Sequence, residues 1–153
     1  MKIWILSFFL IPLIFFSCKK DKYTTEPQVT VKSISPGQVL QGDILMLDAK
    51  FTDDEGDIDS TLIVYKWFDV DAVTITMVDT FRYSLSGLKI PGKLRQGDLS
   101  VQFEYGSTNN QNGYPTFSSV TKDATASFGL VLIDKASHRS NYSESGKIRL
   151  LKP

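Results

Sequence analysis

Apolar and polar residues alternate along most of this chain, and this period of two constrains its fold more than any other feature. The clearest run is residues 99–105, in which four apolar side chains alternate with Ser100, Gln102 and Glu104. Successive side chains of a β-strand point to opposite faces of the sheet, so such a run predicts a strand with one buried and one solvated face. The same period recurs over residues 29–31, 45–51, 63–67, 73–85, 126–132 and 148–150.

Turn residues separate these runs, and together they predict an all-β domain. Gly and Pro in "SPGQ" (35–38) and "IPGK" (90–93) supply backbone angles that turns require. About seven strands in residues 29–153 predict an antiparallel sandwich of immunoglobulin-like type. A domain of this length buries enough surface to fold without disulfides, and the single cysteine, Cys18, has no partner within the chain.

The N-terminal 28 residues differ from the rest. Lys2 precedes a predominantly apolar run over residues 3–16. A helix that spans a bilayer takes roughly 20 apolar residues, so residues 1–17 are interpreted as a secretory signal peptide. Residues 18–28 are polar, lack apolar periodicity, and predict a flexible tether to the domain.

Cys18 lies at the boundary of these two segments. The run Phe15, Phe16, Ser17, Cys18 resembles the lipobox of bacterial lipoproteins, with Phe15 where that family prefers Leu. The resemblance implies a diacylglyceryl group on the Cys18 sulfur and a lipid anchor in the membrane, since two or more acyl chains hold a protein firmly at a bilayer. The alternative is a free cysteine that packs as a small apolar side chain. The "SCKKD" junction is similar to that of Bacteroidota lipoproteins, which implies the outer membrane, on its periplasmic or its surface-exposed face.

Acidic residues crowd between the second and third expected strands. Five carboxylates within residues 53–59 repel one another, and calcium, which takes six to eight oxygen ligands, would relieve that repulsion. The EF-hand pattern does not fit, because Ile58 occupies the position that requires Gly. Sandwich topology brings the sixth-to-seventh connection to the same end of the domain. The candidate calcium ligands are Asp53, Glu55, Asp57, Asp59 and Asp134. The alternative is a solvated turn whose Asp side chains cap their own backbone.

Two short motifs carry a second resemblance. "TDDEGDI" after the second strand and "LIDKASHRSN" near the C-terminus are similar to motifs of Ig-like domains that recur in Bacteroidota lipoproteins. This chain departs from them at Glu55, and at Ser137 and His138, where Gly and Asn are usual. The resemblance implies the fold and no defined activity.

Composition and motifs give little support for catalysis or nucleic-acid binding. Basic and acidic residues balance at 17 each, so no basic surface for nucleic acid is expected. The only histidine, His138, is expected in an exposed turn, and the "GxSxG" and "GxxxxGK" motifs are absent. The sequence favours a non-catalytic envelope module that binds a protein or a glycan through loops such as residues 106–123. The alternative is an accessory subunit or small enzyme in surface glycan handling.

Overall fold

The computed structural model describes residues 23–69, 71–85, 93–106 and 113–153, and the regular structure in these ranges is entirely β-strand. Across those ranges, no helix is long and apolar enough to cross a membrane. The expected signal peptide (residues 1–17) and Cys18 lie outside the described residues, and the expected tether (residues 18–28) is described from Tyr23 onward.

Seven of the described strands correspond to the seven runs of alternating residues. They are β1 (Gln28–Ser35), β3 (Ile44–Thr52), β4 (Ile58–Phe68), β5 (Ile75–Ser84), β6 (Gln96–Tyr105), β8 (Ala124–Asp134) and β10 (Ile148–Leu150). Three strands of two residues each do not follow from the sequence pattern: β2 (Gln38–Val39), β7 (Thr116–Phe117) and β9 (Ser143–Glu144). Two residues are too few to show a period, so pairing with a longer strand defines these elements.

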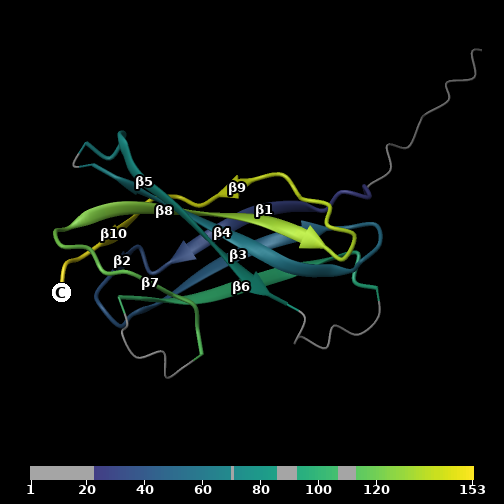
Figure 1. Cartoon of the computed structure of the whole chain (residues 1–153), viewed down its shortest axis with the longest axis horizontal. Helices are drawn as coiled ribbons and strands as arrows, with labels where there is room; N and C mark the ends of the chain where they lie inside the picture. The colour runs from purple at the N-terminus through teal and green to yellow at the C-terminus, as the bar shows by residue number, and fades with distance from the viewer. Residues whose placement is uncertain (1–22, 70, 86–92, 107–112) are drawn as a thin grey trace, which may run out of the picture.

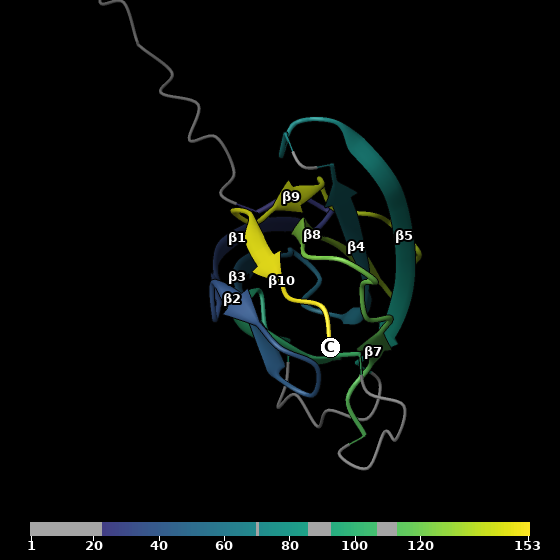
Figure 2. The same ribbon diagram turned by 90° about the vertical axis from the view of Figure 1, so that its left-hand side faces the viewer.

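The strands form two sheets that lie one over the other (Figures 1 and 2). The four-stranded sheet has the order β1-β3-β6-β7, and the six-stranded sheet has the order β2-β10-β8-β4-β5, with β9 paired to β8. Neighbouring long strands are antiparallel, but β2 with β10 and β6 with β7 are parallel. The expectation of purely antiparallel sheets is therefore wrong. Both sheets are mixed, because each includes one two-residue strand, β7 or β2, that pairs in parallel with its neighbour.

Aromatic rings fill the space between the two sheets. The ring of Phe103 in β6 lies 4.9 Å from that of Phe128 in β8, on the facing sheet. Phe117 contacts these two rings at 5.7 and 5.3 Å, and it lies 5.7 Å from Tyr65 of β4. Aromatic pairs of this kind contribute about 0.5–1.5 kcal/mol each beyond the burial of their area. The core therefore joins the two sheets through rings from β4, β6, β7 and β8.

One of the expected apolar faces is only partly buried. The pattern predicts a single strand over residues 73–85, but β5 begins at Ile75 and Val73 lies in the turn before it. Val73 is 75% exposed and Ile75 is 49% exposed. β5 is the edge strand of its sheet, and its first residues project from the end of the molecule (Figure 1). The period of two marks the face correctly, since Phe81 of β5 contacts Phe103 of the facing sheet, but it does not reveal that the first residues of the run are exposed.

Loops gather at the two ends of the sheets. We call one end the tether pole; it is formed by residues 53–57 and 134–138, and the described chain begins there, with the Asp54 N–H donating to the Thr24 carbonyl at 3.2 Å. We call the opposite end the far pole; it holds residues 120–124 and the C-terminus (Figure 1). The two ends of the domain's long axis therefore differ: the tether joins the domain at one end, and the C-terminus lies at the other.

Side chains cover the outer edge of β1. The Val29 N–H donates to Oδ1 of Asn141 at 2.8 Å, and Nδ2 of Asn141 donates to the Val29 carbonyl at 2.9 Å. The Val31 N–H donates to Oγ of Ser143 at 2.9 Å. The segment that contains β9 thus ties the edge of the four-stranded sheet to the six-stranded sheet.

Truncation of one central ring should test this core. Phe103→Ala removes a fully buried ring at the contact between the sheets, so the free energy of unfolding should fall by about 3–5 kcal/mol in urea denaturation. Val73→Ala is the matched control and should change it by less than about 0.5 kcal/mol, because that side chain is exposed. Equal effects of the two substitutions would contradict this description of the core.

Candidate functional site

Residues 53–57 connect β3 to β4 and bring one carboxylate inside the tether pole. Asp53 is 0% exposed; its N–H donates to the Arg95 carbonyl at 2.8 Å, and its Oδ2 accepts a hydrogen bond from the Asp57 N–H at 3.0 Å. Gly56 has a φ of +66°, and a Cβ at this position would lie 2.7 Å from the backbone that leads into β6. Only glycine fits this conformation and this approach without strain. The loop is therefore held in place by its glycine and its first aspartate.

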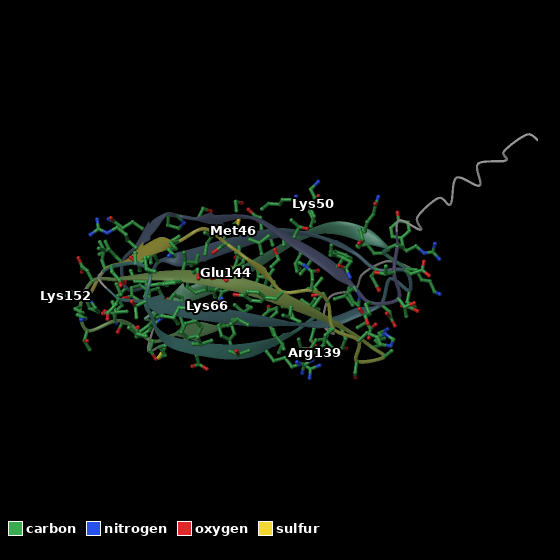
Figure 3. The ribbon with its side chains drawn as sticks, turned by 90° about the horizontal axis from the view of Figure 1, so that it is seen from above. Met46, Lys50, Lys66, Arg139, Glu144 and Lys152 are labelled. Atoms are coloured by element: carbon green, nitrogen blue, oxygen red, sulfur yellow. The ribbon has the colours of Figure 1, made fainter. Side chains whose placement is uncertain are left out.

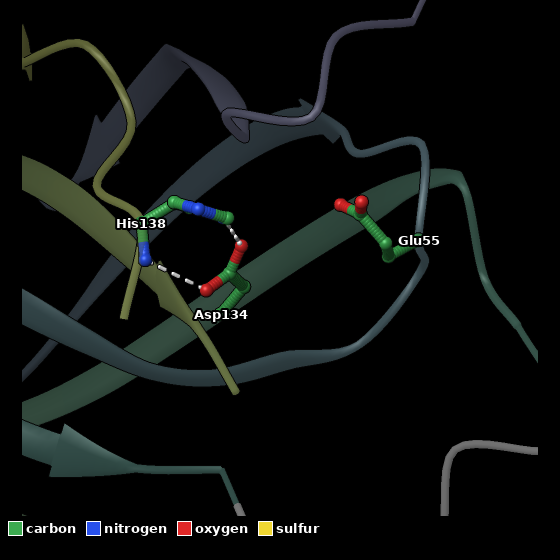
Figure 4. Close-up of side chains that lie close together, drawn as sticks. All are labelled: Glu55, Asp134 and His138. Carbon is green, nitrogen blue, oxygen red and sulfur yellow. Dashed lines mark hydrogen bonds and ion pairs between the residues drawn. The ribbon is translucent and has the colours of Figure 1, made fainter. Parts of the chain in front are cut away.

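The turn after β8 is organised by a second buried carboxylate. Asp134 is 2% exposed, and its two oxygens accept hydrogen bonds from the backbone N–H and from the ring Nδ1 of His138, each at 2.8 Å (Figure 4). The hydrogen bond to Asp134, together with the charge of that carboxylate, raises the pKa of His138 above its ordinary value of 6.5. Asp134 therefore has a structural role in this turn whether or not it binds a ligand.

The two segments place four carboxylates together. One potential ligand oxygen from each residue of the group lies within 4.8 Å of the others: Asp53, Glu55, Asp57 and Asp134. The Lys135 N–H donates to the Asp57 carbonyl at 3.2 Å and holds the turn against the loop. A calcium ion with ligands at 2.3–2.6 Å separates two opposed oxygens by about 4.6–5.2 Å. The group therefore has the dimensions of a site for one such ion.

The structure separates the fifth expected ligand from this group. Asp59 lies in β4, and its Oδ2 pairs with Nη2 of Arg82 in β5 at 3.5 Å. His138 instead forms a second potential ligand group with Glu55 and Asp134, and Figure 4 shows the Glu55 carboxylate directed toward that pair. The spacing of four residues between Asp134 and His138 was the available sequence signal, because side chains at this separation can meet within a tight turn.

Three oxygens of the group are buried without a hydrogen-bond partner: Oδ1 of Asp53, Oε2 of Glu55 and Oδ1 of Asp57. The other two acids of the cluster, Asp54 in the loop and Asp59 in β4, each pair with an arginine. Two like unit charges 4 Å apart repel by about 4 kcal/mol at an effective dielectric constant of about 20. The inner carboxylates are thus close enough to repel one another strongly, and they suit a hard cation better than they suit proton transfer.

The far pole has two adjacent open depressions of about 250 and 230 Å³. Phe68, Asp69 and Lys122 line both of them, and Trp67 lines the smaller one. Nε1 of Trp67 is buried without an acceptor. The larger depression is lined mainly by charged side chains, among them Asp123 and Arg149, and the smaller one combines the two aromatic rings with Asp69 and Lys122.

The long segment before β8 is more ordered than the sequence suggests. Residues 107–112 lie outside the described residues, but Phe117 is buried in the core. The hydroxyl of Tyr105 accepts a hydrogen bond from the Val120 N–H at 3.0 Å and donates to the Leu151 carbonyl at 2.9 Å. The expected binding loop over residues 106–123 therefore contains a short strand, β7, in its C-terminal half. Phe117 packs inside the domain and is not available to contact a ligand.

A second charged cluster lies on the outer face of the six-stranded sheet. Nζ of Lys66 lies 2.6 Å from Oε2 of Glu144, and the hydroxyl of Tyr142 donates to the same oxygen at 2.8 Å. Ser127 donates to the other oxygen of Glu144. Figure 3 shows Lys66 and Glu144 close together over the sheet. The Glu144 hydrogen bonds raise the pKa of Lys66, which keeps that amine protonated, so the cluster fits a role in holding β9 and not one in nucleophilic chemistry.

Comparison with known proteins yields no family for this chain. No family model matches it, and no curated protein matches it. Among solved structures it is similar to the Pseudomonas fluorescens alkylpurine DNA glycosylase AlkC bound to DNA containing an abasic site analog, with 11% identity and a TM-score of 0.42 over 84% of this chain and 31% of that chain.

Two further structures have lower scores. The sporulation control protein Spo0M of Bacillus subtilis has 8% identity and a TM-score of 0.36 over 84% of this chain and 50% of that chain. A CARDB domain from Pyrococcus furiosus, in complex with di-metal ions, has 11% identity and a TM-score of 0.27 over 86% of this chain and 92% of that chain. The chain spans half or less of the first two. Similarities of this size carry no argument about function.

The Glu144 cluster should make stability depend on acid pH. Burial raises the pKa of Glu144, but hydrogen bonds from Lys66, Ser127 and Tyr142 outweigh it and hold the pKa below the ordinary 4.5. The resulting stability is fully present above the unfolded-state pKa and is lost as pH falls through the folded-state pKa. In urea denaturation between about pH 5 and 3, the wild-type should therefore lose stability more steeply than Glu144→Gln.

Asp98→Asn is the control for this comparison, because its carboxylate is exposed and forms an ion pair with Lys50, which is also exposed. This variant should follow the wild-type profile. Parallel profiles for wild-type and Glu144→Gln would show that folding does not lower the pKa of Glu144, which would contradict this prediction.

Proposed function

We propose that this chain is a lipid-anchored, non-catalytic module of the cell envelope whose Ig-like sandwich binds a protein or a glycan at its far pole. The observation that carries the proposal is that the tether and the depressions lie at opposite ends of the domain. Residues 23–27 meet it at the tether pole, whereas the depressions lined by Trp67 and Phe68 lie at the opposite end. A ligand bound there would face away from the anchor.

Contacts at the base of the tether support this orientation. The hydroxyl of Tyr23 donates to Oε1 of Gln96 at 3.2 Å, and the Arg95 guanidinium lies 6.0 Å from the Tyr23 ring centre. Cys18 precedes Tyr23 by five residues, which span at most about 18 Å of extended chain. An acylated Cys18 would therefore keep the tether pole close to the bilayer and leave the far pole directed outward.

The fold and the motifs support the remaining parts of the proposal. Two stacked sheets with seven long strands fit an Ig-like sandwich, in agreement with the "TDDEGDI" and "LIDKASHRSN" motifs. The "SCKKD" junction supports attachment at the outer membrane, on either face.

A small enzyme or accessory subunit in surface glycan handling is the second candidate, and the Asp134–His138 hydrogen bond is the observation that favours it. A carboxylate that orients an imidazole is part of a hydrolase triad. The nearby Ser140 hydroxyl, however, accepts from the Leu132 N–H and donates to the Asn141 carbonyl. Because those hydrogen bonds occupy the hydroxyl, the non-catalytic module is the better-supported candidate.

Acylation of Cys18 is the test of the anchored module. The native protein should partition into the detergent phase of a temperature-induced separation, and mass spectrometry should show an N-terminus at Cys18 that carries acyl chains. Cys18→Ser removes the only sulfur available for the thioether, so no acylated mature form of this variant should be found. A native N-terminus at any other residue, or a native protein that stays in the aqueous phase, would contradict the proposal.

A further inference from the structure

We propose that the tether pole binds one calcium ion through the carboxylates of Asp53, Glu55, Asp57 and Asp134. The arrangement of charges in the β3–β4 loop is the first argument. The two acids outside the group, Asp54 and Asp59, each have an arginine within 3.6 Å. In the described part of the chain, no lysine or arginine forms an ion pair with the four members of the group. Arginines therefore neutralise the two outer acids, whereas among the inner acids only Asp134 has a cationic partner in the described residues, His138 when its ring is protonated.

Burial supplies an independent argument. Asp53 is completely buried, yet its Oδ1 accepts no hydrogen bond, and the same is true of buried oxygens of Glu55 and Asp57. An ionised carboxylate oxygen can only accept, so it requires a donor or a cation. Burial of a charge without such a partner is strongly unfavourable. A single divalent ion would supply the missing positive charge to all of these residues, because one carboxylate oxygen of each lies within 4.8 Å of the others.

The ligand set selects calcium among common metal ions. All four ligands are carboxylates, which calcium accepts in irregular arrangements of six to eight oxygens, whereas magnesium requires a near-ideal octahedron and retains water. Zinc favours imidazole and thiolate ligands, and His138 is absent from the four-carboxylate group. His138 instead positions Asp134 by donating to its carboxylate. Each carboxylate oxygen can accept twice, so Asp134 keeps capacity for the ion.

The ion would join parts of the chain that are far apart in sequence. Three of its ligands come from the β3–β4 loop and the fourth comes from the end of β8. The same loop is bonded to two other segments. The Asp54 N–H donates to the Thr24 carbonyl at the base of the tether, and the Asp53 N–H donates to the Arg95 carbonyl just before β6. Calcium would therefore stabilise the end of the domain at which the tether is attached. The inference does not depend on acylation of Cys18.

Calcium titration of the full chain, purified in a mild non-ionic detergent and freed of metal with chelator, tests the site. Extracellular calcium modules bind with dissociation constants of about 0.1–1 mM, and a ligand that binds only the native state raises its stability. When free calcium is about 100 times the dissociation constant, the melting temperature should rise by about 5–10 °C. Magnesium at the same concentration should produce a smaller rise.

Charge-neutral variants identify the ligands. Asp53→Asn and Asp57→Asn should each weaken calcium binding at least about tenfold in calorimetry, because each removes a charged ligand. In chelator, both variants should melt at or above the wild-type temperature, since each also removes like-charge repulsion. Asp59→Asn, two residues after Asp57 and at the start of β4, is the matched control; because Asp59 pairs with Arg82, this variant should keep the full calcium response.

Three results would overturn the proposal. The first is a wild-type melting temperature that does not change at 10 mM calcium. This measurement uses the wild-type protein alone, so it holds even where a variant fails to fold. The second is an undiminished calcium response in both Asp53→Asn and Asp57→Asn. The third is a rise with zinc but not with calcium that disappears in His138→Gln, which would assign the metal to the group of Glu55, Asp134 and His138.

Discussion

The pairing of β4 with β8 is the constraint on which the rest of this structure depends. Ile58, at the start of β4, lies opposite Asp134, at the end of β8, so the loop before β4 and the turn after β8 emerge side by side. A slip of one residue would turn every inward side chain of β8 to the other face of the sheet. Phe128 would then leave the aromatic core and Asp134 would leave the acidic group. Hydrophobic packing thus enforces the register that brings the carboxylates together.

Much of this arrangement follows from local sequence. The period of two predicts the seven long strands, and two-sheet topology predicts that Asp134 approaches the β3–β4 loop. Features decided by tertiary context do not follow: β9 exists because Glu144 reaches Lys66 and Ser127, and Phe117 packs into the core from a polar segment. From the sequence, Asp59 is as good a candidate calcium ligand as the neighbouring acids. In the structure it lies in β4, where it pairs with Arg82.

In the β3–β4 loop the backbone forms a well-bonded turn, but the carboxylates that it brings together repel one another. Asp53 and Gly56 are the residues that this turn requires, and the backbone hydrogen bonds of the loop are well formed. The same fold buries three carboxylate oxygens that have no partner. Sequences are usually consistent across levels, and functional sites are where that consistency fails. Two other buried polar atoms of the described residues also lack a partner, Nε1 of Trp67 and Oε2 of Glu104, but only the tether pole gathers three such oxygens in one loop.

The hydrogen bonds of Asn141 to β1 have a consequence for assembly. An edge strand ordinarily offers unpaired backbone groups to which a second polypeptide can add. Here the side-chain amide of Asn141 bonds to both the N–H and the carbonyl of Val29, as a neighbouring strand would. The Ser143 hydroxyl accepts from the next outward N–H, that of Val31. The first half of β1 is therefore closed to a second copy of this chain, and two short polar side chains hinder strand addition on that side of the four-stranded sheet.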